Sequence, residues 1–236
     1  MLNYHFQWEL ILHGQYRDWI LTGLVVTLQL SIVSMILSFI FGLIVAVMRL
    51  SHVRLVRGLA TAYLEFFRNT PLLVQIFFWY FGSYKLLPEG LNDWLNNSNL
   101  FEFVAACVAL VFYTSAFIAE DIRSGVLAIP KEQMEAARSS GLTYLQSMRF
   151  IILPQAVRLT VPPLINQFLN LTKNSSLAMT IGVAELTYQA RQIESHTLRS
   201  FEAFMAVTLI YLGISIVITY MVAVYDRKVL NVVRGR

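Results

Sequence analysis

Charge is scarce in this chain of 236 residues. Asp, Glu, Lys and Arg together make up 14% of the sequence, whereas soluble domains carry about 25%. Apolar residues reach 57%, above the roughly 45 to 50% of soluble domains, and the mean hydropathy is +0.60. A surface so poor in charge could not be solvated, which excludes an ordinary soluble protein. We therefore expect most of the chain to lie in a membrane.

Residues for metal binding and catalysis are also few. The single cysteine, Cys107, excludes a disulfide within the chain and a cysteine-rich metal site. The four histidines lack the spacing of metal ligands, so we expect no metal: His5, His13, His52 and His196. The sequence also lacks a nucleophile motif and the Gly-x-x-x-x-Gly-Lys-Ser/Thr phosphate-binding loop. We expect no catalytic residue and no cofactor, and any ATP hydrolysis must occur in a partner.

Long runs with little charge indicate five membrane-spanning helices. A helix needs about 20 apolar residues to cross the hydrocarbon core. The predicted spans are 21–48, 59–82, 103–122, 156–181 and 203–225. The first run is too long for the apolar part of a cleavable signal peptide, and no basic cluster precedes it. The second carries Glu65, Arg68 and Pro71 in its first half, and Pro162-Pro163 predicts a broken or bent fourth span.

The basic residues indicate the orientation. Five spans put the two termini on opposite sides, and twelve of the eighteen Lys and Arg residues fall on the side that holds the C-terminus. Only four fall on the other side. By the positive-inside rule, the segment 1–20 is periplasmic and the tail 226–236 is cytoplasmic. This asymmetry accounts for the net charge of +4, so we expect no nucleic-acid partner.

The longest cytoplasmic segment, 130–154, predicts a helix, a turn and a second helix. Pro130 is suited to a first helical turn, residues 131–140 are good helix formers, and Gly141 terminates them. Thr143 and Gln146 have the spacing of a capping box that starts the next helix. We expect Pro154 to bend or end that helix.

In this segment the sequence resembles the permeases of ATP-binding-cassette (ABC) importers. The residues that match the spacing of that family's EAA motif are Glu135, Ala136, Ala137, Gly141, Ile151, Leu153 and Pro154. The spacing is long and interrupted, which makes the match far more specific than a lone glycine motif. The chain is further similar to polar amino-acid permeases, above all those for glutamate and aspartate, in Phe67–Gln75, Pro130–Gln133, Leu153–Ala156, Pro162–Pro163 and Lys173–Ser175.

The resemblance implies an all-α protein with the type I ABC importer permease fold, which crosses the bacterial inner membrane several times. It implies as partners two ABC ATPase subunits, a second permease, similar or identical, a periplasmic solute-binding protein and membrane lipid. The EAA loop would couple to the ATPase, with Glu135 pairing a basic group, Ala136 and Ala137 keeping the contact shallow, and Gly141 allowing close approach. The external loops 83–100 and 183–200 would receive the binding protein, or serve only as solvated connections.

Polar groups inside the spans indicate a candidate pathway for the substrate. Charged residues in a bilayer are costly and usually face a cavity or a partner. The candidates are Lys173, Asn174, Ser175, Ser176, Arg68 and Thr70. Lys173 either lines a cavity or pairs with Glu120 or Glu65, and Arg68 either pairs with Glu65 or shapes an inner gate with Thr70. Similar permeases for basic amino acids often have Asp where this chain has Asn174, which favours glutamate or aspartate, with glutamine or another polar amino acid second.

Two rival functions make different demands on the sequence. An intramembrane enzyme needs catalytic groups that the chain lacks. A carrier or channel subunit driven by an ion gradient needs a complete pathway, yet five spans without an inverted repeat supply about half of one. Uptake in membranes that contain this chain but no ATPase would favour the carrier.

Overall fold

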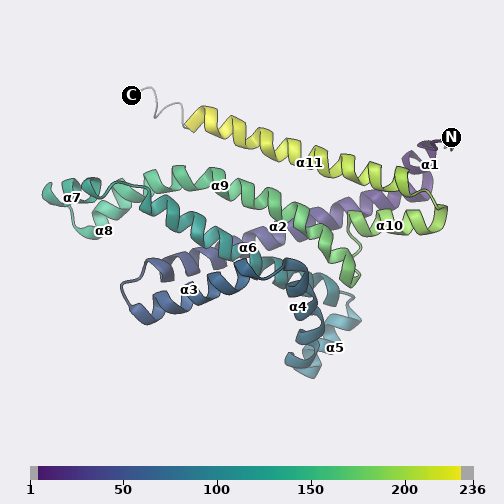
Figure 1. Cartoon of the computed structure of the whole chain (residues 1–236), viewed down its shortest axis with the longest axis horizontal. Coiled ribbons are helices and arrows are strands. Elements are labelled where there is room, and N and C mark those ends of the chain that lie inside the picture. Colours follow the sequence, from purple (N-terminus) through teal and green to yellow (C-terminus); the bar gives the residue numbers. More distant parts are fainter. Residues whose placement is uncertain (1–4, 230–236) are drawn as a thin grey trace. The chain divides into compact units, whose positions relative to one another are not determined.

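The computed structural model describes residues 5–229, and within that range it contains helices and their connections but no strand. Figure 1 labels the α-helices along the chain. The elements are α1 (Glu9–Leu12), α2 (Gly14–Leu50), α3 (Arg54–Asn69), α4 (Leu72–Leu86), α5 (Glu89–Asn97), α6 (Phe101–Leu127), α7 (Lys131–Ser139), α8 (Tyr144–Ser147), the π-helical turn η1 (Met148–Ile152), α9 (Leu153–Asn174), the 3-10 helix η2 (Ser175–Ile181), α10 (Leu186–Thr197) and α11 (Ser200–Val229).

Four helical segments of the described chain are long and apolar enough to cross a membrane. They are Gly14–Leu50, Phe101–Leu127, Tyr144–Ile181 and Ser200–Met221, and a shorter apolar helix covers Leu72–Gly82. Each overlaps one of the predicted spans. Residues 1–4 of the predicted periplasmic segment and residues 230–236 of the predicted tail lie outside the described residues.

The region predicted as a single second span, 59–82, is divided between two helices. α3 ends at Asn69, Thr70 is extended with φ −108° and ψ 140°, and α4 begins after Pro71. Proline disfavours the helical conformation of the residue before it and has no N–H to donate, which explains the break. α3 is amphipathic, with Ala60 and Leu64 buried on one side and Leu59 and Phe66 exposed on the other.

The fourth predicted span is interrupted, although at a different place from the one expected. Pro162 and Pro163 lie inside α9, and the helix continues through them to Asn174. The α-helix then tightens into the 3-10 helix η2, which ends at Gly182 with φ +95°. Glycine adopts this left-handed conformation without a steric penalty, so it is a suitable end for the segment.

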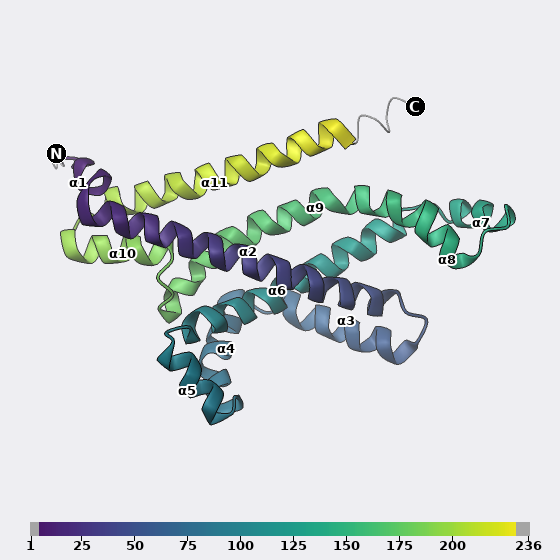
Figure 2. The ribbon, with the colours of Figure 1, turned by 180° about the vertical axis from the view of Figure 1, so that it is seen from behind.

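The helices form two compact units, of which the first comprises residues 5–35, 71–110 and 170–217. Its apolar core brings together Ile20 of α2, Ile193 of α10 and Val207 of α11. Figure 2 shows α10 beside the beginning of α2. At this contact, a Cβ on Gly23 would lie 3.1 Å from the main chain of Leu186, so the two helices pack at backbone distance.

A buried carboxylate organises one end of this first unit. Glu185 is fully buried and caps α10, because its side chain accepts hydrogen bonds from the backbone N–H groups of Thr187 and Tyr188. The hydroxyl of Tyr211 donates a third hydrogen bond to it at 2.8 Å. Burial raises the pKa of the Glu185 carboxyl despite these hydrogen bonds.

The second unit comprises residues 36–70, 111–169 and 218–229. α3 lies beside the last turns of α2 in both views (Figures 1 and 2). Small buried residues permit this close packing, among them Ala46 of α2, Ala60 of α3 and Ala116 of α6. The phenol oxygen of Tyr63 lies 2.7 Å from the hydroxyl oxygen of Ser115 and ties α3 to α6.

Candidate functional site

The segment with the EAA spacing folds into the predicted pair of short helices. α7 begins after Pro130 and ends in a Schellman motif, in which the N–H of Gly141 bonds to the carbonyl of Arg138 and the N–H of Leu142 to that of Ala137. Gly141 has φ +88°, a conformation that favours glycine. The predicted helix and its termination by Gly141 are therefore confirmed, although the helix covers 131–139 rather than 131–140 and Pro130 lies just before its first turn.

The second helix of the pair begins with the predicted capping box. The backbone N–H of Thr143 donates to the side-chain oxygen of Gln146 at 2.8 Å, and the N–H of Gln146 donates to the Thr143 hydroxyl at 3.3 Å. The chain continues as one turn of α-helix, the π-helical turn η1 and then α9. Pro154 does not end the helix: it lies in the first turn of α9, directly after η1 interrupts the α-helical hydrogen bonding. We call residues 130–154 the coupling loop.

Apolar packing fixes the base of the coupling loop. Ile129, Ile152 and Ala156 form a buried cluster, against which Met134 and Met148 pack. This cluster joins α7 and η1 to the end of α6 and the start of α9. The loop thus rests on a small core of its own.

Close backbone contact and a side-chain hydrogen bond reinforce the base. A Cβ on Gly125 would lie 2.1 Å from the hydroxyl oxygen of Thr160 and 3.3 Å from the carbonyl oxygen of Ala156, so α6 and α9 touch where they cross. The amide of Gln155 donates to the side-chain oxygen of Gln133 and to the carbonyl of Ile151. α7 and α9 are therefore linked by polar as well as apolar contacts.

The EAA-motif residues differ in their burial. We call the turn around Gly141, together with the exposed residues of α7 and α8, the tip of the coupling loop. Glu135, Ala136, Gly141, Leu153 and Pro154 are exposed, Ile151 is half-buried, and Ala137 is buried. Ile151 packs against the buried cluster at the base, and Ala137 is itself buried. The exposed members remain available to a partner.

Three large exposed apolar residues of the coupling loop were not among the predicted site residues. Leu145 is 77% exposed, and Phe150 and Tyr144 are 63% and 49% exposed. Exposed apolar side chains of this size gather at protein interfaces. The available signal was the occurrence of three large apolar residues within nine positions after Gly141, interspersed with Thr143, Gln146, Ser147 and Arg149.

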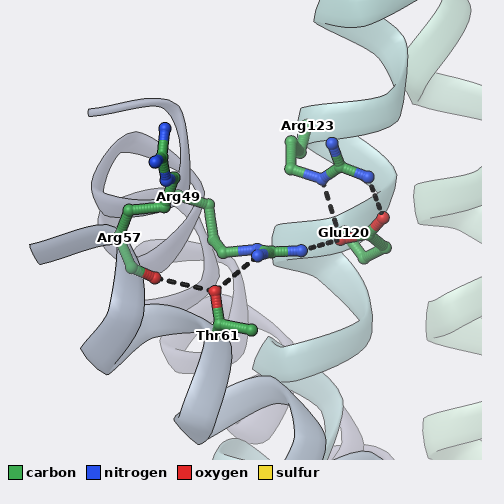
Figure 3. A network of polar contacts seen from close by, with 5 residues as sticks. All are labelled: Arg49, Arg57, Thr61, Glu120 and Arg123. Carbon is green, nitrogen blue, oxygen red and sulfur yellow. Dashed lines mark hydrogen bonds and ion pairs between the residues drawn. The ribbon is translucent and has the colours of Figure 1, made fainter. Parts of the chain in front are cut away.

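A polar network ties α2 and α3 to α6 a few residues before the coupling loop (Figure 3). The guanidinium of Arg123 donates two hydrogen bonds to the Glu120 carboxylate, one of them at 3.0 Å from Nε. Arg49 Nη2 lies 3.6 Å from Glu120 Oε2, and Arg49 Nη1 donates to the Thr61 hydroxyl at 2.6 Å. The Thr61 hydroxyl donates in turn to the carbonyl of Arg57. Arg49 of α2 thereby links Glu120 of α6 to Thr61 of α3.

The residues proposed for a substrate pathway fall in both units. Residues 173–176 lie in the first unit, at the junction of α9 and η2, and Arg68 and Thr70 lie in the second. Lys173 is exposed, Asn174 and Ser176 are half-buried, and Ser175 is buried. Lys173 and Ser176 are three residues apart on the exposed side, whereas Ser175 points into the core.

The acidic residues considered as partners for Lys173 and Arg68 are engaged elsewhere. Glu120 binds Arg49 and Arg123. Glu65 accepts a hydrogen bond from the Asn69 amide at 2.8 Å, whereas the guanidinium of Arg68 lies over the ring of Phe117, 5.3 Å from its centre. Of the two alternatives given for Arg68, the pair with Glu65 is not among the ion pairs of the described residues, and Arg68 contacts the Phe117 ring of α6 instead.

The matched family covers most of the chain. Residues 38–231 match the family described as binding-protein-dependent transport system inner membrane component. The chain belongs to this family. The ABC importer permease resemblance drawn from the EAA spacing is confirmed.

Similar proteins and a similar solved structure agree with the assignment of the chain to this family. The chain is 46% identical over 203 residues to the probable glutamine ABC transporter permease protein GlnM of Bacillus subtilis (strain 168), covering 86% of this chain and 89% of the relative. It is 36% identical over 217 residues to the glutamate/aspartate import permease protein GltJ of Escherichia coli (strain K12), covering 91% and 88%. It superposes on a chain from the crystal structure of an amino acid ABC transporter with histidines with a TM-score of 0.85 at 31% identity, covering 96% of this chain and 100% of that one. The all-α type I permease fold is confirmed.

Proposed function

We propose that this chain is the permease subunit of an ATP-driven importer of polar amino acids in the bacterial inner membrane. The names of its relatives support an amino acid as the class of substrate. The subunit itself is non-catalytic, and two cytoplasmic ATPase subunits hydrolyse ATP. A periplasmic binding protein delivers the amino acid, and a second permease, similar or identical, completes the pathway.

The observation that carries this proposal is the division of the coupling loop into a fixed base and an exposed tip. An ATPase that contacts Glu135, Ala136 and Leu145 would bind an exposed surface. That surface is fixed to α6 and α9 through the cluster around Ile152 and the close contact at Gly125. A rigid contact of this kind transmits a displacement, because a close-packed core shifts as a body rather than deforming continuously. The loop is therefore suited to move the membrane helices when the ATPase closes.

Gly141 offers a direct test of this coupling. In the isolated chain a Cβ at this position would meet no atom within 4 Å, so a side chain there would collide only with a partner. Its φ of +88° is the second cause to separate, because this conformation strains residues other than glycine. We expect Gly141→Asp to leave insertion intact and to abolish ATP-dependent uptake in vesicles that contain the whole transporter. Gly141→Asn separates the two causes, because Asn tolerates positive φ and still adds a side chain; we expect it to lose uptake as well.

The matched control is Gly58→Asp. Gly58 lies on the exposed side of α3, and a Cβ added there would also meet no atom within 4 Å, but the residue is far from the coupling loop in sequence. Normal uptake by the control and by Gly141→Asp alike would contradict the proposed coupling. Uptake without any ATPase would instead favour an ion-gradient carrier.

For the substrate, we propose glutamate or aspartate, with glutamine second. The exposed ammonium group of Lys173 beside the uncharged Asn174 favours an anionic side chain over a cationic one. We expect Asn174→Asp to shift the preference toward basic amino acids, measured by competition of arginine and glutamate against labelled substrate. An unchanged preference would remove the argument, and Asn170→Asp, one turn earlier on the exposed side, is the control.

The distribution of Lys and Arg residues supports an orientation of the chain in the membrane, and with it the side on which each partner binds. We propose that the coupling loop and the C-terminus are cytoplasmic, with loops 83–100 and 183–200 facing the binding protein. The excess of Lys and Arg on the coupling-loop side supports this orientation. Labelling of single cysteines introduced at Ser139 and Asp93, both exposed, tests it: only the Asp93→Cys variant should react with an impermeant reagent added outside.

A further inference from the structure

An apolar cavity lies where α4, α5 and α6 meet in the first unit. Its volume is about 330 Å³, and every side chain that lines it is apolar. Trp79 comes from α4, Leu91 and Trp94 from α5, and Phe101 and Val108 from α6. The lining includes no residue of the coupling loop and none of those proposed for the substrate pathway.

Local hydrogen bonds hold the walls of this cavity in place. The amide of Asn92 donates to the carbonyl of Leu87 at 3.2 Å and fixes the start of α5. At the other end, Asn99 has φ +52° and the N–H of Leu100 bonds back to the carbonyl of Leu95 at 3.1 Å. Both ends of α5 are thus held by hydrogen bonds to neighbouring main-chain atoms.

The exposure of the lining residues distinguishes a mouth from a floor. Trp94 is 59% and Leu91 is 43% exposed, whereas Phe101 is 7% exposed. Polar residues of α5, including Asp93, Asn96 and Asn97, are exposed and do not line the cavity. The helix therefore presents its apolar side to the cavity and its polar side to water.

The chemistry of the lining determines what the cavity can hold. An apolar cavity of about 150 Å³ stays dry and binds a small hydrocarbon, and this one has about twice that volume. A polar amino acid or a chain of waters would find no hydrogen-bond partner among these side chains. Its burial there would be unfavourable, because burying an unsatisfied polar group costs several kcal/mol.

The position of α5 identifies the hydrocarbon. This helix connects the apolar helices α4 and α6, so it lies at a boundary between membrane and water, where tryptophan is enriched. The apolar molecules present at high concentration at that boundary are phospholipid acyl chains. We propose that this cavity binds one acyl chain of a membrane phospholipid, which enters past Trp94 and Leu91 and lies against Trp79.

Brominated lipid provides the test, because bromine quenches tryptophan fluorescence on contact. The whole transporter is reconstituted in phosphatidylcholine vesicles that carry bromine at the middle of the acyl chains. The signal of Trp79 is taken as the difference between the parent and its Trp79→Phe variant. We expect Trp79 to be quenched, and we expect Val108→Phe, which fills the cavity from α6, to remove this quenching.

A matched variant separates the cavity from ordinary lipid around the protein. Val74→Phe places the same side chain on the exposed side of α4, where Val74 is 59% exposed and does not line the cavity. We expect it to leave the quenching of Trp79 unchanged. Equal quenching in Val108→Phe and Val74→Phe, or no quenching in the parent, would overturn the proposal.

A competition experiment needs no filling variant and stands if Val108→Phe fails to assemble. Hexane added to the brominated vesicles should displace the acyl chain and restore the fluorescence of Trp79, while the fluorescence of Trp19, isolated with Trp19→Phe, should not change. Trp19 does not line the cavity. Quenching of Trp79 that hexane does not relieve would count against the site.

Discussion

Gly125, at the base of the coupling loop, and Gly141, at its tip, are both glycine, but for opposite reasons. Gly125 lies in a regular helix, where a Cβ would come within 2.1 Å of Thr160. Gly141 has open space around it, but its φ of +88° disfavours any side chain. The first glycine allows two helices to touch, and the second allows the chain to turn.

The contrast between these two positions extends to their surroundings. Near Gly125 the side chains of Ile129, Ile152 and Ala156 are buried, whereas near Gly141 those of Leu145 and Tyr144 are exposed. A change at the base should therefore affect the stability of the fold, and a change at the tip should affect the partner. The following substitutions test that division.

The largest effect on stability is expected from Gly125→Val. Its side chain would overlap Thr160 and the carbonyl of Ala156, and overpacking of a close contact costs about 1 to 3 kcal/mol or more. We expect loss of a well-folded transporter, measured by thermal unfolding in detergent. The double variant Gly125→Ala with Thr160→Ala should recover stability that Gly125→Ala alone loses, and equal stability of these two variants would contradict the close contact.

A smaller loss is expected from Glu120→Gln. The change removes the carboxylate that binds both Arg49 and Arg123, and because the Glu120 side chain is 22% exposed, we expect the loss to be about 1 kcal/mol. For a chain of this size, 1 kcal/mol corresponds to about 2 to 4 °C in the unfolding temperature. Glu65→Gln, at an exposed position bonded only locally to Asn69, is the control. A decrease as large in the control would argue against the network.

The smallest effect on stability is expected from Leu145→Asp. Leu145 is 77% exposed in the first turn of α8, where an acidic residue is favourable. We expect an unchanged unfolding temperature together with about tenfold weaker ATPase binding, as for loss of a central contact at an interface. Leu198→Asp, another exposed position outside the coupling loop, should leave ATPase binding intact. Equal binding by both variants would exclude Leu145 from the docking surface.

Local sequence signals predicted the parts of the fold that depend on neighbouring residues. The termination of α7 at Gly141 and the capping box of Thr143 and Gln146 depend on a few residues each, and both were predicted correctly. The charge-free runs likewise predicted where the long apolar helices occur. Each of these features is set by backbone preferences or by the cost of burying charge.

Features that depend on distant residues were not predictable in this way. Arg49 and Glu120 are 71 positions apart in the sequence, and Gly125 and Thr160 are 35 positions apart. No local sequence pattern can therefore predict either contact. The passage of α9 through Pro162 and Pro163 also differs from the expectation, although neither proline has an N–H to donate within the helix. The opposite outcome at Thr70–Pro71 shows that a proline alone does not decide whether a helix ends.

The hydroxyl groups of Ser176 and Thr180 in η2 have a consequence for what this surface accepts. Ser176 donates its proton to the carbonyl of Lys173, and Thr180 donates to that of Leu177, each at 2.7 Å. With their protons committed to the main chain, these oxygens present only lone pairs outward. A molecule touching them meets hydrogen-bond acceptors and must supply the donors itself. On the proposed substrate pathway, such oxygens would suit the ammonium end of an amino acid better than its carboxylate end.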